Sequence, residues 1–528
     1  MNVYLKPNIQ VDPLFNSWYA WNLLVPPVTA AINTAERHLK MMTSFVNAPA
    51  MHAAALRNPA MRGGMFIDLD ASRVPDVKAL IETTKTRAAH LIEFSKAMTE
   101  LNKMLQEKAK GMAMESLYEF IPEPLRGYVE LCYDMANNPF FRVHESLLYR
   151  SKYYAENCQS VALSEITRDR NRPFMLSTPR LPDGQTVFLE VPFSDPRLDE
   201  LFRMKRAPRP FSDVVEMFKG VATEAQLRPL FTEQAPPPVS RYTGEGFRVR
   251  YLGHATLLIE SKDVTILTDP IISYNYGASP ERFTFEDLPE SIDYVLITHS
   301  HHDHVHFETL MQLRHMVKTI VVPRNFDGFP QDPSLQLALK HTGFRNVQEI
   351  RDLDEIGIPG GSIAALPFLG EHHDLNVQSR ATYRVEIGGR SILAIADSGI
   401  LDARLFDEMQ RLYGKSEVLF LGMECEGAPA SWIYGPMFTK PLTREVDQSR
   451  RARGSNYAEA VALIERLGFG DGVYVYAMGQ EPWLSHILDN ELSDESVALA
   501  ESKRLMEYCS AKGITAEHLF ARKEIMVG

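Results

Sequence analysis

The sequence is poor in cysteine and has neither a long uncharged apolar run nor an excess of positive charge. Its four cysteines (Cys132, Cys158, Cys425 and Cys509) lie far apart and form no CxxC pair, which argues against a disulfide framework, a zinc knuckle or an iron–sulfur cluster. No stretch is apolar for long enough to cross a bilayer, and residues 1–13 lack the pattern of a signal peptide. We therefore expect a cytoplasmic protein without a membrane span.

The formal net charge of −12 argues against general nucleic-acid binding, because neutralising phosphates requires a basic face. Two short runs, 203–209 and 450–453, are locally basic. Each is interpreted either as a solvated loop or as a patch that docks an acidic partner.

With 528 residues, the chain exceeds what one hydrophobic core usually holds, so we expect two domains. The first two hundred residues show mainly helical periodicity, clearest between 76 and 112, with one expected strand at 185–191, and they contain no chemical motif. Between 232 and 246, three consecutive prolines and two glycines stiffen and expose the chain, and we place the boundary there.

From 246 to 528 the pattern changes to short β-branched runs separated by turns and helices. This alternation predicts an α/β domain in which helices cover sheets. The expected strands are 247–251, 256–260, 264–267, 294–298, 319–322, 363–368, 392–396, 418–423 and 473–477.

One of these strands leads into the sequence His-Ser-His-His-Asp-His at 299–304. In an extended loop, His299 and His301 face the same side and can reach one metal ion, while Asp303 and His304 face a second ion once the chain turns. A purely structural cluster would bury several imidazoles and a carboxylate without partners, which is costly. The spacing therefore predicts a site for two metals.

Further candidate ligands follow later strands. Asp397, in Asp-Ser-Gly, is positioned to bridge both ions, or else caps a turn. His486 could complete the second site, although it is an isolated histidine identified only by its place after a strand. Upstream, Asp269 either orients a ligating histidine or belongs to a simple Asp-Pro turn, and His254 is expected to face the cavity.

Glu371 stands after a glycine, at the position where hydrolytic proteins with this motif usually have histidine. As a ligand, it would bring the site to three carboxylates, with Asp303 and Asp397. Oxygen anions stabilise ferric iron and suit a metal that changes oxidation state, whereas zinc has no redox chemistry. The alternative is that His372 or His373 binds instead and restores a dizinc site.

Together, the 299–304 cluster, the Leu-Gly-Glu-His block at 369–372, Asp397 and the segments 422–435 and 478–483 resemble the di-iron β-hydroxylases of non-ribosomal peptide biosynthesis. The resemblance implies a C-terminal metallo-β-lactamase αββα sandwich over 246–528, preceded by a helix-rich α+β domain over 1–240 that serves dimerisation and docking. It also implies that one iron is held by His299, His301 and Glu371, that the other is held by Asp303, His304 and His486, and that Asp397 bridges the two.

The implied reaction is dioxygen-dependent hydroxylation of the β-carbon of an amino acid, tethered as a thioester to the carrier protein of a peptide synthetase. No flavin or nucleotide motif is present, so reducing equivalents must come from a separate reductase. The family likeness implies a homodimer. Candidate pocket residues are Glu424, Glu426, Trp432, Tyr434 and Glu481.

Three alternatives remain open at this point. A dizinc hydrolase would cleave an ester, lactone or phosphodiester with a metal-bridging hydroxide. A non-catalytic scaffold would have kept only the fold for docking synthetase modules. A flavodiiron-type reductase would need a flavin-binding domain, of which the sequence shows no convincing sign.

Overall fold

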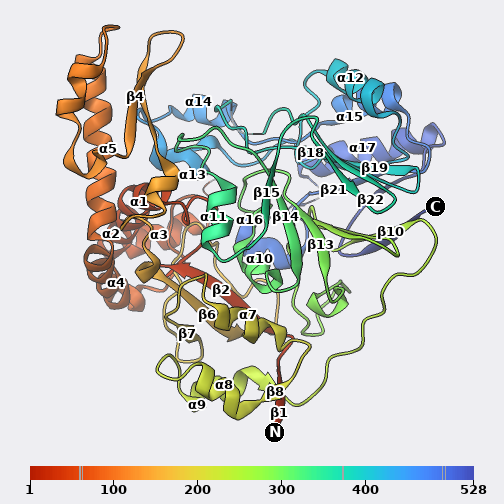
Figure 1. Cartoon of the computed structure of the whole chain (residues 1–528), viewed down its shortest axis with the longest axis horizontal. Coiled ribbons are helices and arrows are strands. Elements are labelled where there is room, and N and C mark those ends of the chain that lie inside the picture. Colours follow the sequence, from red (N-terminus) through yellow and green to blue (C-terminus); the bar gives the residue numbers. More distant parts are fainter. Residues whose placement is uncertain (59–60, 62, 372–373, 490–491, 494) are drawn as a thin grey trace.

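The structure is a computed structural model that describes residues 1–58, 61, 63–371, 374–489, 492–493 and 495–528. Its C-terminal half contains two seven-stranded sheets (Figure 1). The first has the order β15-β14-β13-β12-β11-β10-β23 and the second the order β16-β17-β18-β19-β20-β21-β22. One hydrophobic cluster, which includes Val249 and Ile266 of the first sheet and Val385 and Phe420 of the second, packs the sheets face to face.

The strands of the first sheet are β10 (Phe247–Tyr251), β11 (Leu257–Glu260), β12 (Thr265–Thr268), β13 (Ile292–Leu296), β14 (Val317–Pro323), β15 (Val347–Ile350) and β23 (Lys523–Val527). Those of the second are β16 (Glu355–Ile358), β17 (Gly361–Leu366), β18 (Thr382–Ile387), β19 (Arg390–Ala394), β20 (Val418–Gly422), β21 (Gly472–Tyr476) and β22 (Ala516–His518). All nine expected strands are present within three residues at either end.

Helices cover the outer face of each sheet. Helices α10 (Phe307–Leu313) and α11 (Leu335–His341) pack beside the first sheet. Helices α12 (Ala403–Tyr413), α15 (Tyr457–Leu467) and α17 (Val497–Ala511) share a hydrophobic cluster with the second sheet. They lie beside that sheet at the upper right of Figure 1. The αββα sandwich predicted from the sequence is confirmed.

The N-terminal half combines helices with a small sheet. Strands β2 (Ile9–Phe15) and β6 (Gln159–Glu165) pair antiparallel at the centre of the four-stranded order β3-β2-β6-β7. The helical pattern predicted from 76 to 112 forms two helices, α4 (Val74–Arg87) and α5 (Ala89–Lys108). The backbone leaves the helical conformation at Ala88, where the sequence has no proline or glycine to mark a break.

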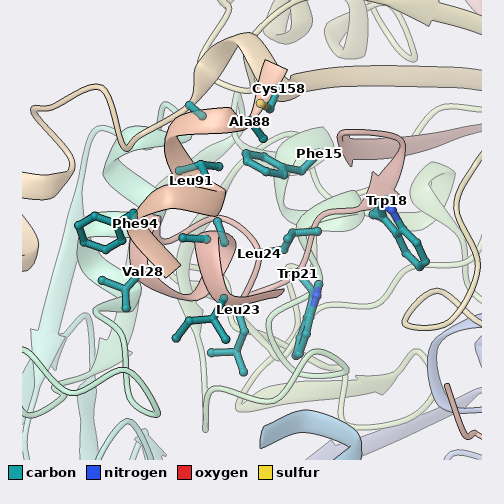
Figure 2. Packing of buried hydrophobic residues seen from close by; sticks show 14 of the residues in the cluster. Phe15, Trp18, Trp21, Leu23, Leu24, Val28, Ala88, Leu91, Phe94 and Cys158 are labelled. Carbon is teal, nitrogen blue, oxygen red and sulfur yellow. The ribbon is translucent and has the colours of Figure 1, made fainter. Parts of the chain in front are cut away.

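The apolar face of α5 packs into a core built from the start of the chain. Leu91 and Phe94 lie with Phe15, Leu24 and Val28 in this core (Figure 2). The same cluster also takes in C-terminal residues such as Ile433 and Leu484, and a second cluster joins the N-terminal sheet to the first C-terminal sheet. The two halves therefore share their hydrophobic cores, and N-terminal side chains can reach the neighbourhood of the predicted site.

The segment 233–246, between β9 (Phe231–Thr232) and β10, forms no helix or strand and is mostly exposed. In the part of the chain that the structure describes, no helix has both the length and the apolar character needed to span a bilayer.

Candidate metal centre

The loop after β13 carries four of the predicted ligands into the interior, all of them buried. Their donor atoms fall into three overlapping groups, in each of which all atoms lie within 4.8 Å of one another. These groups are His299, His301 and Glu371; His299, His304 and Asp397; and His254, Asp303 and His304. Shared histidines link the groups, so the arrangement is one continuous centre large enough for two ions.

Glu371 lies at the inner end of the turn that follows β17. Its Oε1 is 3.0 Å from Nδ1 of His301, and its Oε2 accepts a hydrogen bond of 2.6 Å from the backbone N–H of Arg453. The residue has φ of +61°, which a side chain other than glycine adopts only when its surroundings hold it. The carboxylate is thus aimed at the histidines, while the competing candidates His372 and His373 lie outside the described residues.

Asp397 follows β19 and lies between the groups. Its Oδ2 is 3.1 Å from Nε2 of His304 and 3.8 Å from Nε2 of His299. Its Oδ1 is buried and has no hydrogen-bond partner among the described residues. A buried carboxylate oxygen without a donor is costly, and a bridging cation would satisfy it.

His486 is not brought into this arrangement. The ring packs beside α10, where its Nε2 is 3.8 Å from Oε2 of Glu308, and it is grouped with Glu308 and His306. The group that contains Asp303 instead has His254 as its other histidine, with Nε2 at 3.2 Å from Oδ2 of Asp303. The structure therefore places His254, and not His486, beside Asp303, because position after a strand does not determine where the following turn points; the assignment of His486 to the second ligand shell stays a prediction.

A second layer of hydrogen bonds orients His304. Asp269 Oδ2 lies 2.8 Å from Nδ1 of His304, which leaves Nε2 facing Asp397. The backbone N–H of Thr298 donates to Oδ1 of Asp269 at 2.8 Å and its hydroxyl donates to Oδ2 at 2.5 Å. The expected role of Asp269 as the acceptor that orients a histidine is confirmed, and such partners tune ligand basicity.

The charges of the site favour bound cations. Burial alone would lower the pKa of His304, yet the carboxylates of Asp397, Asp269 and Asp303 outweigh it and raise that pKa well above its usual value. Burial, followed by the neighbouring carboxylates, raises the pKa of Glu424 well above the ordinary range for glutamate. So many acids in a buried space repel one another unless positive charge is present, and the donor set fits two metal ions.

Several turns around the centre have left-handed backbone. Besides Glu371, the residues with positive φ include His254 (49°), Asp269 (34°), Ala396 (50°) and Ala477 (55°), each next to the end of a strand that faces the site. Such conformations cost about 1–3 kcal/mol each and persist where packing over-determines them. The fold therefore stabilises sharp turns that aim side chains at the metals.

A cavity of about 830 Å³ opens above the ligands. Of the predicted pocket residues, Glu424, Glu426 and Trp432 line it. Tyr434 and Glu481 do not: both are buried, and Glu481 accepts a hydrogen bond from the Tyr251 hydroxyl. The N-terminal wall of the cavity carries no local sequence signal and was not predicted; among the described residues it includes Asn58, Met61, Gly64, Phe66, Phe174 and Leu176.

The sequence matches two family profiles. Residues 4–236 match the profile described as diiron non-heme beta-hydroxylase N-terminal domain, and residues 248–422 match a beta-lactamase superfamily domain. Over 99% of its length, the chain is 36% identical to a 4-amino-L-phenylalanyl-(CmlP-peptidyl-carrier-protein) 3-hydroxylase of Streptomyces venezuelae, whose whole length is covered.

The fold agrees with that similarity over the whole chain. The crystal structure of CmlA, a diiron beta-hydroxylase from Streptomyces venezuelae, superposes with a TM-score of 0.92 at 35% identity and full coverage of both chains. An N-acyl-phosphatidylethanolamine-hydrolyzing phospholipase D of Caenorhabditis elegans is 29% identical over 94 residues, which are 15% of this chain and 26% of that protein. The similarity to a hydrolase is thus confined to a short segment.

Proposed function

The chain belongs to the diiron non-heme β-hydroxylases, and from that premise we propose that it hydroxylates the β-carbon of an amino acid bound as a thioester to a peptidyl carrier protein. The full-length likeness to a carrier-protein-dependent 3-hydroxylase carries this conclusion. The site agrees with it, because Glu371 adds a third carboxylate to the centre beside Asp303 and Asp397.

Within this proposal, His299, His301 and Glu371 would hold one iron, Asp303 and His304 would hold the other with His254 beside them, and Asp397 would serve both. Two ferrous ions, once bound, jointly supply electrons to dioxygen for attack on a C–H bond. The buried carboxylates offset the charge that iron gains on oxidation. Asp269 keeps the His304 ring in one orientation through its hydrogen bond of 2.8 Å.

The cavity walls would hold the substrate. Glu424 lines the cavity close to the metal ligands, and it is the acidic side chain that we assign to an ammonium group on the carbon next to the one that reacts. Phe66, Phe174 and Trp432 supply apolar surface that excludes water from the centre. The amino acid that fills this space is not specified by these residues.

The carrier protein is the partner implied by the relative. A separate reductase, a homodimer and a cytoplasmic location stay predictions. A dizinc hydrolase is disfavoured, because the chain matches a hydroxylase over its whole length, including the N-terminal 4–236 region, whereas the nematode phospholipase D matches 15% of it.

The proposal is tested by incubating the iron-loaded protein with aminoacyl carrier proteins, a chemical reductant and dioxygen. Mass spectrometry of the carrier-bound product should show one added oxygen atom for at least one amino acid. Metal analysis should find about two irons per chain. Two zinc ions together with hydrolysis of simple esters would instead support the hydrolase.

A further inference from the structure

The cavity above the metal ligands ends at a pair of arginines. Arg444 and Gln448 line it one helical turn apart on α14 (Arg444–Ser449), and Arg451 lines it just beyond that helix. Arg444 and Gln448 are exposed, whereas the metal ligands at the other end are buried. The cavity is therefore open to solvent at this end.

A short antiparallel ladder connects this opening to the metal centre. The segments 424–429 and 451–454 are joined by backbone hydrogen bonds of 2.7 and 2.8 Å and by an isolated β-bridge. In the second segment, the backbone N–H of Arg453 holds the carboxylate of Glu371. Two residues of extended chain span about 7 Å, so along this segment Arg451 lies about 7 Å from Arg453, the residue whose backbone contacts Glu371.

The guanidinium groups at the opening are not neutralised by any described carboxylate. Arg444 makes no ion pair with a described residue, and Arg451 donates from Nη1 to Oε1 of Gln448 at 2.7 Å. The Nε of Arg451 is buried and has no acceptor in the described part of the chain. Asp447 of the same helix is already used, since it accepts hydrogen bonds of 2.9 and 2.7 Å from Ser431.

The other basic run offers no comparable group. In 203–209, Arg203 and Arg209 both pair with Glu200. Arg206 donates to three backbone carbonyls of residues 285, 286 and 288. Lys205 places its Nζ 4.3 Å from the centre of the Phe285 ring. None of these side chains lines the cavity above the metal ligands, whereas Arg444 and Arg451 do.

We propose that Arg444 and Arg451 bind the phosphate of the carrier protein's phosphopantetheine arm at the cavity opening. The inference rests on the proposed function, which requires such an arm to enter. Guanidinium groups suit phosphate because their paired N–H donors match its oxygens, and the Gln448 amide adds a further donor. Glu426 is exposed and also lines the cavity, and its negative charge would repel a phosphate, so the phosphate is expected on the side of the arginines. With its phosphate held here, the arm directs its thioester toward the buried ligands.

The experiment compares binding of 4′-phosphopantetheine and pantetheine to the iron-loaded full chain by calorimetry. The variants are Arg444→Gln and Arg451→Gln, and the matched control is Arg411→Gln, whose residue pairs with Glu408 on α12, away from the cavity. We expect wild-type protein to prefer the phosphorylated ligand. Arg451→Gln should weaken its binding about tenfold, and the more exposed Arg444→Gln severalfold, while binding of pantetheine stays unchanged.

Holo- and apo-carrier proteins separate recognition of the arm from recognition of the carrier surface. The two variants should weaken holo-carrier binding and leave apo-carrier binding as in wild type. Equal affinity for the two small ligands, or equal losses for both in the variants, would overturn the phosphate site. A chain that binds 4′-phosphopantetheine as expected but hydroxylates no loaded carrier would retain this site and reject the proposed function.

Discussion

Replacing Asp269 by asparagine should empty the second metal position while leaving the fold intact. The carboxylate is fully buried, and its Oδ2 lies 2.8 Å from Nδ1 of His304. Asparagine keeps the shape but removes the charge, and one of its two terminal groups becomes a donor. With Oδ1 kept as acceptor for the backbone N–H of Thr298, the new NH₂ would face the histidine N–H.

The expected loss of iron affinity follows from the hydrogen bond between Asp269 and His304 that the substitution removes. A hydrogen bond to a charged group contributes about 1.5–3 kcal/mol, and a factor of ten corresponds to about 1.4 kcal/mol. Iron at the position held by Asp303 and His304 should therefore bind roughly 10- to 100-fold more weakly, in line with the usual effect of removing a partner of a metal-bound histidine. The first position, which does not use His304, should keep its iron.

The assay is iron stoichiometry during titration with a competing chelator, read together with the thermal midpoint. Asp293→Asn is the matched control, because Asp293 accepts a hydrogen bond of 2.8 Å from the backbone N–H of Thr265 in the same sheet but touches no metal ligand. We expect about one tightly held iron per chain in Asp269→Asn and two in the control. Two irons of unchanged affinity in a folded Asp269→Asn protein would refute the reasoning.

Three further outcomes are expected. Glu371→His should shift the metal preference from iron to zinc and abolish oxygen insertion, as measured by metal analysis and product mass; retained hydroxylation would contradict the role of the carboxylate. His254→Ala should lower iron retention, whereas His486→Ala should keep two irons, and the opposite pattern would restore His486 as a ligand. Burial lowers the pKa of Lys205 from 10.5 to about 7, so between pH 7 and pH 10.5 the unfolded chain binds a proton that the folded chain does not, and the free energy of unfolding should rise with pH across that window. Lys205→Met should flatten this rise. At pH 7 it should also raise the thermal midpoint and increase the free energy of unfolding by at most about 5 kcal/mol.

Much of the metal centre could be predicted because its ligands are local in sequence or follow strands. His299, His301, Asp303 and His304 lie within six residues, so a strand followed by a turn brings them together whatever surrounds it. Asp397 also follows a strand, but that strand, β19, belongs to the second sheet, so its approach to the 299–304 loop depends on the face-to-face packing of the two sheets. The strands themselves were visible as β-branched runs between turn residues.

Tertiary structure alone decided which histidine stands beside Asp303. His254 lies in a turn with positive φ that points its ring at the carboxylate, while His486 turns toward Glu308. Chain position cannot separate the two, because the direction of a side chain after a strand depends on the backbone of the turn and on what packs against it. The break between α4 and α5 at Ala88 was likewise decided by the tertiary structure, since no glycine or proline in the sequence marks it.

The N-terminal half shows most clearly the difference between what the sequence determines and what tertiary packing decides. Its sequence determined a helical face, and residues such as Leu91 and Phe94 are buried as their spacing requires. Its contribution to the cavity, through Phe66 and Phe174, depends on hydrophobic cores shared with the C-terminal half. Periodicity reports which face of an element is buried, but the partner of that face is chosen by long-range packing, which no local pattern encodes.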